Sequence, residues 1–111
     1  MKEVVYVSND GTPVSSPEAG VQRQILAFNP HLMLVRHQFE KGWQGARHKH
    51  PHDQIVYVTR GCILFTGAEE SVEMHVGDSV VIAGGIEHEA TALEDSEVLD
   101  IFTPMREDYA N

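Results

Sequence analysis

Polar side chains occupy alternate positions in one short stretch: His48, His50, His52 and Gln54. The stretch leads into the β-branched and aromatic run 55–58, which favours an extended backbone. Side chains two positions apart on a strand face the same side, so three imidazoles and an amide share one face. Such a face fills a hydrophobic core poorly, whereas neutral imidazole nitrogen binds Zn, Ni, Cu and Fe. The stretch therefore predicts a β scaffold around a transition-metal site.

Short apolar runs separated by turn-forming residues continue along the chain. They span residues 4–7, 21–28, 32–39, 55–58, 62–65, 72–76, 80–82 and 98–102. The proline-containing stretch 12–20 predicts a loop that leaves the first strand free to pair elsewhere, including on a neighbouring subunit. The only helical segment expected is the tail at 105–110. We therefore expect a single all-β domain over residues 1–111, either a barrel or a two-sheet jelly roll.

The charge balance limits the kinds of partner. The formal net charge is -9 with histidines neutral, which argues against nucleic acid or an anionic membrane surface. A small anionic substrate stays open, because a metal dication and one or two arginines reverse the sign locally. The sequence contains no bilayer-spanning apolar run and no signal-peptide pattern. The one cysteine, Cys62, cannot close an intramolecular disulfide, which favours a cytoplasmic location; its simplest role is as a small buried apolar residue.

A second glycine- and histidine-containing stretch, residues 77–88, completes a pattern that resembles the cupin family. The first cupin motif is matched by Gly42, His48, His50 and Gly61, and the second by Gly77, Gly85 and His88. Gln54 stands where the family usually has glutamate, while Ala83 and Ala92 replace a proline and an asparagine that are not ligands. The resemblance implies a cupin barrel (double-stranded β-helix, or jelly roll) with a short C-terminal helical turn. It also implies a metal site formed by His48, His50, Gln54 and His88.

Glutamine in place of glutamate changes the charge of the predicted site. With only neutral donors, one divalent ion (Zn, Ni, Fe or Mn) keeps its full charge and becomes a stronger Lewis acid. The donor set also departs from the two-histidine, one-carboxylate triad of non-haem iron oxygenases. A coordinating water in place of Gln54 remains an alternative. Because Pro51 bends the backbone beside it, His52 is expected to have a supporting or structural role.

The end of the last predicted strand carries Asp100 and Phe102 on one face, followed by Arg106. If that face is the barrel interior, Asp100 is either paired or functional, since burying an unpaired charge is costly. The simpler interpretation is a carboxylate that orients an imidazole. Arg106 either returns over the barrel mouth to grip a carboxylate or pairs with the acidic tail at 107–108.

From about residue 20 to the C-terminus, the chain resembles the KdgF-type cupins of pectin and alginate catabolism. The resemblance is carried by segments 20–26, 32–35, 39–42, 48–54 and 102–108. It implies opening of the ring of 4,5-unsaturated uronates to open-chain keto acids, with Asp100, Phe102 and Arg106 as catalytic or substrate-contacting residues. A homodimer is expected, because pairing would cover exposed sheet edges and because the family that the chain resembles is often dimeric. The alternatives are a metal-dependent dioxygenase and a non-catalytic sugar- or acid-binding cupin.

The remaining histidines and the cations beside the predicted ligands carry weaker expectations. His31, His37 and His75 are most simply turn or solvent-facing strand residues. Arg47 and Lys49 have the opposite parity to the histidines beside them and should point outward.

Overall fold

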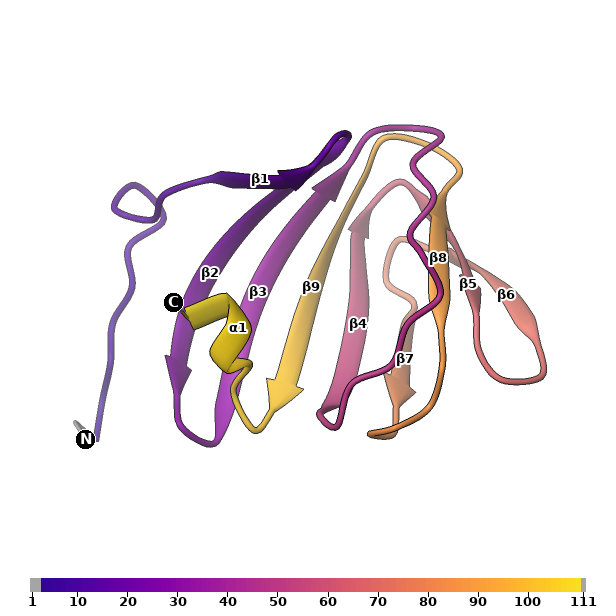
Figure 1. Ribbon diagram of the computed structural model, residues 1–111. Coiled ribbons are helices and arrows are strands. Elements are labelled where there is room, and N and C mark those ends of the chain that lie inside the picture. The colour runs from indigo at the N-terminus through magenta and orange to yellow at the C-terminus, as the bar shows by residue number, and fades with distance from the viewer. Residues whose placement is uncertain (1–2, 111) are drawn as a thin grey trace.

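The computed structural model describes residues 3–110, which form two antiparallel β-sheets (Figure 1). The elements are β1 (Ser15–Glu18), β2 (Val21–Asn29), β3 (Leu32–Phe39), β4 (Asp53–Arg60), β5 (Cys62–Thr66), β6 (Ser71–His75), β7 (Ser79–Ile82), β8 (Glu89–Ala92), β9 (Ser96–Thr103) and α1 (Glu107–Ala110). The larger sheet has the order β1-β2-β3-β9-β4-β7, and the smaller has the order β6-β5-β8. Residues 42–50 run along β8 and extend the smaller sheet through isolated bridges. The predicted all-β, two-sheet architecture with a short C-terminal helical turn is confirmed.

Most predicted strands are present, and one is not. Residues 4–7 form no strand, although their composition favours one. A strand needs a partner edge, and the edge of β2 is instead paired with β1, inside the stretch predicted to be a loop. Contacts of side chains on β2 and β3 tether the leading segment: Gln24 donates to the Thr12 carbonyl and Arg36 to Asn9. Residues 4–7 therefore have the composition of a strand but no neighbouring strand, among the described residues, to pair with, and they are exposed.

The core lies between the two sheets and is built from alternate residues of each strand. Its main cluster consists of Val56, Val58, Ile63, Phe65, Met74, Ile82, Ala92 and Val98. A second cluster of Met33, Val35 and Phe102 packs under the C-terminal residues Tyr109 and Ala110. The helix α1 therefore closes one side of the space between the sheets, beside β2 and β3 (Figure 1).

Glycines of both cupin motifs turn the chain where other residues would be strained. Gly61 links β4 to β5 with a φ of 82°, in the left-handed region that favours glycine. A Cβ at this position would also collide with Ser96 and the Asp95 carbonyl. Gly85 has a φ of 84° and donates its N–H to the His50 carbonyl. This bond ties the loop that precedes His88 to the first histidine segment.

Across residues 3–110, no helix has the length and apolar character required to cross a bilayer.

Candidate metal centre

Three histidines from two separate segments meet beside a cavity between the sheets, which His48 and His88 line. His48 and His50 precede β4, and His88 precedes β8, held side by side by reciprocal backbone hydrogen bonds between His48 and His88. Each ring offers a nitrogen atom, and the three atoms lie within 4.8 Å of one another. The ring centroids of His48 and His88 are 4.4 Å apart, and those of His50 and His88 are 5.0 Å apart. The spacing of the two motifs thus brings together the residues it singled out.

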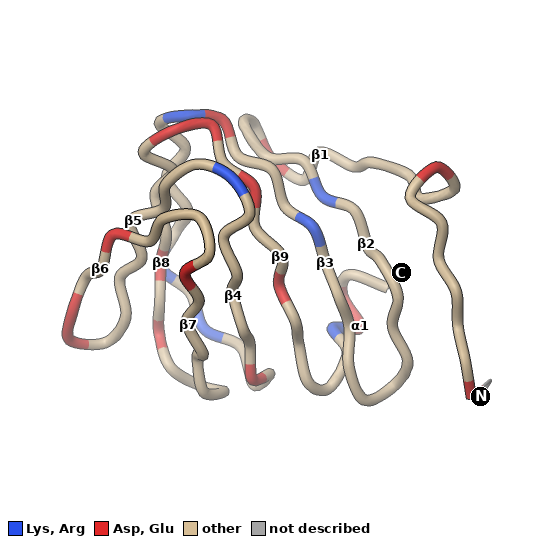
Figure 2. Tube along the Cα trace, turned by 180° about the vertical axis from the view of Figure 1, so that it is seen from behind, with Lys and Arg blue, Asp and Glu red and all other residues tan. Residues whose placement is uncertain are grey.

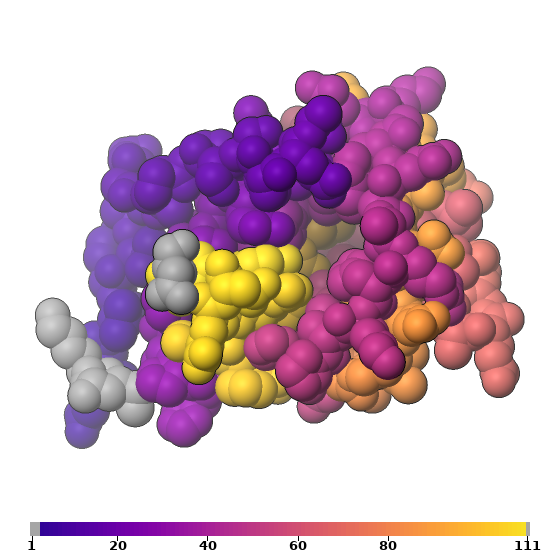
Figure 3. Space-filling model, viewed as in Figure 1, coloured from indigo at the N-terminus to yellow at the C-terminus, as the bar shows by residue number. Residues whose placement is uncertain are grey.

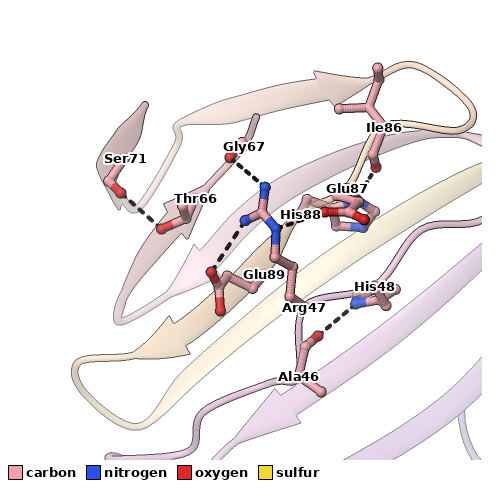
Figure 4. Close-up of polar contacts among 10 residues, drawn as sticks. All are labelled: Ala46, Arg47, His48, Thr66, Gly67, Ser71, Ile86, Glu87, His88 and Glu89. Carbon is pink, nitrogen blue, oxygen red and sulfur yellow. Dashed lines mark hydrogen bonds and ion pairs between the residues drawn. The ribbon is translucent and has the colours of Figure 1, made fainter. Parts of the chain in front are cut away.

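Backbone carbonyls orient all three rings in the same sense. The Nδ1 atom of His48 lies 2.9 Å from the Ala46 carbonyl, and that of His88 lies 2.9 Å from the Ile86 carbonyl (Figure 4). The Nδ1 atom of His50 lies 3.0 Å from the His52 carbonyl. A carbonyl only accepts hydrogen bonds, so a neutral ring with its proton on Nδ1 donates to this contact and presents a lone pair on Nε2. This arrangement prepares three Nε2 atoms as ligands.

Burial favours the uncharged form of two of these rings. His50 and His88 are 7% and 4% exposed, and this burial lowers the pKa of each imidazole below its usual 6.5. The Nε2 atom of His88 is buried and has no hydrogen-bond partner among the described residues. A buried polar atom without a partner is costly, and a cation at the meeting point of the rings would satisfy it. His48 is exposed and lies at the open side of the site.

The amide of Gln54 completes the donor set. Its Nε2 atom donates to Asp100 Oδ1 at 2.8 Å, which points Oε1 toward His50 Nε2 at 2.9 Å. With His50 protonated on Nδ1, both facing atoms carry lone pairs, and a shared cation removes the repulsion between them. Three imidazole nitrogens and one amide oxygen therefore fit a divalent transition-metal ion.

A hydrogen-bonded chain crosses the inner face of the larger sheet from the metal ligands to the far side of the cavity. Asp100 Oδ2 lies 2.6 Å from His37 Nδ1, and Arg23 Nε donates to His37 Nε2 at 2.9 Å. Adjacent strands β4, β9, β3 and β2 each supply one member: Gln54, Asp100, His37 and Arg23. Because Arg23 occupies Nε2 as a donor, His37 carries its proton on Nδ1 and donates it to Asp100. Both carboxylate oxygens then accept N–H groups, a pattern suited to an ionised carboxylate.

The expectation that His37 faces solvent is wrong. Its side chain is 7% exposed and lies inside the cavity. His37 shares parity with Met33, Val35 and Phe39, so the inward-facing pattern of β3 already contained the signal. Asp100 is only 4% exposed, so the face that it shares with Phe102 is the inner one, and the imidazole that it touches is that of His37.

Phe102 and Arg106 also line the cavity, which has a volume of about 300 Å³. Phe102 is 1% exposed, with its ring centroid 5.8 Å from that of His50 and 5.7 Å from that of Tyr109. Arg106 does return toward the mouth, yet it also forms a two-bond contact with Asp108 at 3.2 and 2.9 Å. In Figure 3 the mouth is a hollow bordered by N-terminal, C-terminal and central residues of the chain.

Arg47 and the other histidines named from the sequence contribute no ligand to this centre. Arg47 points outward and pairs with Glu87 and Glu89 (Figure 4), and His31 and His75 are exposed as expected. His52 supports the centre through its carbonyl, which orients His50. Cys62 is 4% exposed, and burial raises the pKa of its thiol. Among the described residues, Cys62, Glu73 and His75 form the other group with suitable donor spacing.

Comparison with known proteins identifies relatives over nearly the whole chain. The model of the cupin domain family (Cupin_2) matches residues 35–102. Pectin degradation protein KdgF of Dickeya dadantii is 35% identical over 94% of this chain and 96% of its own length. The structure of KdgF from Halomonas sp. superposes with a TM-score of 0.90 at 38% identity, covering 95% of this chain and 99% of that one. An RmlC-like cupin from Shewanella frigidimarina superposes with a TM-score of 0.90 at 31% identity, over 94% of each chain.

Proposed function

The chain belongs to the cupin domain family. Within this family, we propose that it is a metal-dependent enzyme that opens the ring of 4,5-unsaturated uronates. The observation that carries the proposal is the inward chain of Gln54, Asp100, His37 and Arg23, which links the histidine centre to a cationic end of one cavity. The cavity has a volume of about 300 Å³, at the lower end of the range for small-molecule sites, as expected for a site that binds a monosaccharide. The similarity to KdgF proteins of pectin degradation supports the same substrate class.

In the proposed site, His48, His50, His88 and Gln54 hold one divalent metal ion. When bound, such an ion supplies Lewis-acid stabilisation to an oxygen atom that gains negative charge. Because the four donors are neutral, the positive charge of the site is not reduced by its ligands. The sequence and geometry leave the choice among Zn, Ni, Fe and Mn to availability.

Asp100 is the proposed proton shuttle. The substrate is a cyclic hemiacetal whose ring oxygen is attached to an alkene carbon. Asp100 takes the proton of the hemiacetal hydroxyl; the carbonyl forms as the bond between that carbon and the ring oxygen breaks, leaving an enolate. The same proton is then delivered to the neighbouring alkene carbon, giving a ketone. Atoms balance without a co-reactant, so the net reaction is an isomerisation.

The remaining cavity residues bind and orient the sugar in this proposal. Phe102 offers an apolar surface to the ring, and its own position is fixed by the contact with Tyr109. Arg106 adds positive charge at the mouth, reduced by its contact with Asp108. The enzyme therefore attracts a small sugar acid despite its overall negative charge.

The direct test incubates metal-loaded protein with unsaturated galacturonate or guluronate and follows the alkene absorbance. We expect decay well above the buffer blank, with loss of the excess rate after chelation. Decay no faster than the blank would overturn the proposal. Oxygen consumption during the reaction, followed with an electrode, would instead indicate a dioxygenase.

We also propose a cytoplasmic homodimer that uses the outer face of the larger sheet. This face exposes Ile55, Tyr57, Val81 and Ile101 on adjoining strands, an apolar surface of the kind that partners cover. Val81 is 70% exposed, so Val81→Lys should convert a dimer to monomers in sedimentation equilibrium without unfolding the chain. Wild-type protein that sediments as a monomer would contradict this assembly.

A further inference from the structure

Arg23 is a cavity-lining cation that the sequence did not single out. It stands on β2 directly opposite His37 of β3, and both side chains line the cavity. Arg23 lies on β2 and Arg36 on β3, and Figure 2 shows basic positions along these two adjacent strands. Neighbouring residues of a strand face opposite sides, so Arg36, paired with Gln24, faces outward where Arg23 faces inward.

Two contacts hold the Arg23 guanidinium in place without neutralising it. Its Nε atom donates to neutral His37, and its Cζ atom lies 3.8 Å from the centroid of the Tyr109 ring. A cation over an aromatic face is stabilised, and the ring restricts the plane of the guanidinium. Neither anchoring group carries a negative charge, so no direct ion pair offsets the positive charge that Arg23 brings to the cavity.

Arg23 and Arg106 differ in what occupies their N–H groups. Arg106 places both Nε and Nη2 on the carboxylate of Asp108. Across residues 3–110, no hydrogen bond or carboxylate within ion-pair distance engages the terminal Nη atoms of Arg23; its one side-chain hydrogen bond is made by Nε. Terminal guanidinium groups presented in this way match the two oxygens of a carboxylate. Arg23 is therefore the better prepared of the two arginines to bind an anion.

We propose that Arg23 is a substrate-binding and specificity-determining residue that grips the carboxylate of the sugar acid. This inference rests on the proposed function. Arg23 and Gln54 lie at opposite ends of the series of side-chain hydrogen bonds that runs through His37 and Asp100. A substrate with its carboxylate on Arg23 thus extends past Asp100 toward the histidine centre. The position of Arg23 fixes which end of the sugar faces that centre.

The test compares Arg23→Gln with Arg36→Gln, which removes the same charge from the opposite face of the sheet. The probes are D-galacturonate and its methyl ester, which share a sugar ring and differ in charge, titrated into metal-loaded protein and followed by NMR. Arg23→Gln should weaken galacturonate binding about 10- to 100-fold, the loss expected for a charge-assisted contact, and leave ester binding near that of wild type. The KM for the unsaturated uronate should rise by a similar factor. Arg36→Gln should match wild type in each measurement.

Arg23→Lys keeps the charge but not the planar fork, so its preference for acid over ester should be intermediate. If Arg23→Gln does not fold, this variant carries the test, and a preference equal to that of wild type would overturn the inference. Equal loss of acid and ester binding in Arg23→Gln would also overturn it, because Arg23 would then act only on the shape of the cavity. Wild-type protein with no preference for the acid over the ester would do the same.

These measurements separate the inference from the proposed function. An acid preference that depends on Arg23, in protein that leaves the alkene intact, would support the inference and refute the ring-opening activity. Turnover with an unchanged KM in Arg23→Gln would support the activity and refute the inference.

Discussion

Replacement of Asp100 by asparagine removes one of the two acceptor oxygens at the centre of the buried chain. If the amide oxygen of the new asparagine faces Gln54, its NH2 group faces the Nδ1–H of His37. If the amide oxygen faces His37 instead, the NH2 group faces the NH2 group of Gln54. Turning His37 to its other tautomer moves the conflict to Arg23, which donates to the same ring. Every arrangement that keeps Gln54 in place therefore leaves one donor facing another donor, in a site where Asp100 is 4% exposed.

The expected cost follows from the hydrogen bonds that the carboxylate accepts. A hydrogen bond to a charged group contributes about 1.5–3 kcal/mol, and Asp100 accepts two of them, at 2.6 and 2.8 Å. Removing one should lower the free energy of unfolding by about 2 kcal/mol and the Tm by about 10 °C. Removing the proton shuttle should lower kcat by about 100- to 10,000-fold. Thermal unfolding followed by circular dichroism and the alkene assay measure the two effects.

Glu97→Gln is the matched control, because it makes the same chemical change on the same strand. Glu97 contacts Thr59, Gln38 and Arg36 at a partly exposed site, so the cost should be about 1 kcal/mol or less, with kcat unchanged. An Asp100→Asn protein as stable as wild type would refute the assignment of two buried N–H contacts to the carboxylate. Turnover near the wild-type rate would remove Asp100 as the shuttle.

Two further experiments test the histidine centre: a pH series on metal-free protein and the substitution Gly84→Ala. In metal-free protein, the Tm should fall as the pH drops below about 6.5, because burial lowers the pKa of His50 and His88 in the fold and the unfolded chain takes up protons first. His88→Gln should flatten this dependence in melting curves, and an unaltered slope would contradict the assignment. Gly84→Ala places a Cβ against the Pro51 carbonyl, whereas at Gly67 the nearest neighbour is Phe65, 3.7 Å away. Calorimetry should therefore show weaker Zn²⁺ binding for Gly84→Ala than for Gly67→Ala, and equal affinities would argue against this support of the centre.

Sequence patterns predicted the features that depend on local chain geometry. The spacing of histidines around turn glycines is enough to bring His48, His50 and His88 together, because the segments that carry them pair through their backbones. Strand parity likewise put Asp100 and Phe102 on one face, and the structure shows that this face is the inner one. The strand predicted at residues 4–7 failed for the converse reason, since no pattern within a strand reveals whether an edge is available to it.

The far end of the cavity depends on information that no single segment carries. The contact of Arg23 with His37 requires the register of β2 against β3, and its contact with Tyr109 requires the C-terminal turn to fold back over that sheet. The alternation along β3 was sufficient to place His37 inside. The partners of His37, which are Arg23 and Asp100, lie on neighbouring strands and depend on the register of β2, β3 and β9.

The central claim is that three Nε2 atoms, prepared by carbonyl contacts on Nδ1, meet at one divalent ion. Titration of ¹⁵N-histidine protein with Zn²⁺, followed by long-range ¹H–¹⁵N NMR, tests it directly. We expect the Nε2 resonances of His48, His50 and His88 to shift together and saturate at one equivalent, while each Nδ1 keeps its proton. Zn²⁺ that shifts the Nδ1 resonances, or that leaves any of the three rings unchanged, would contradict the claim.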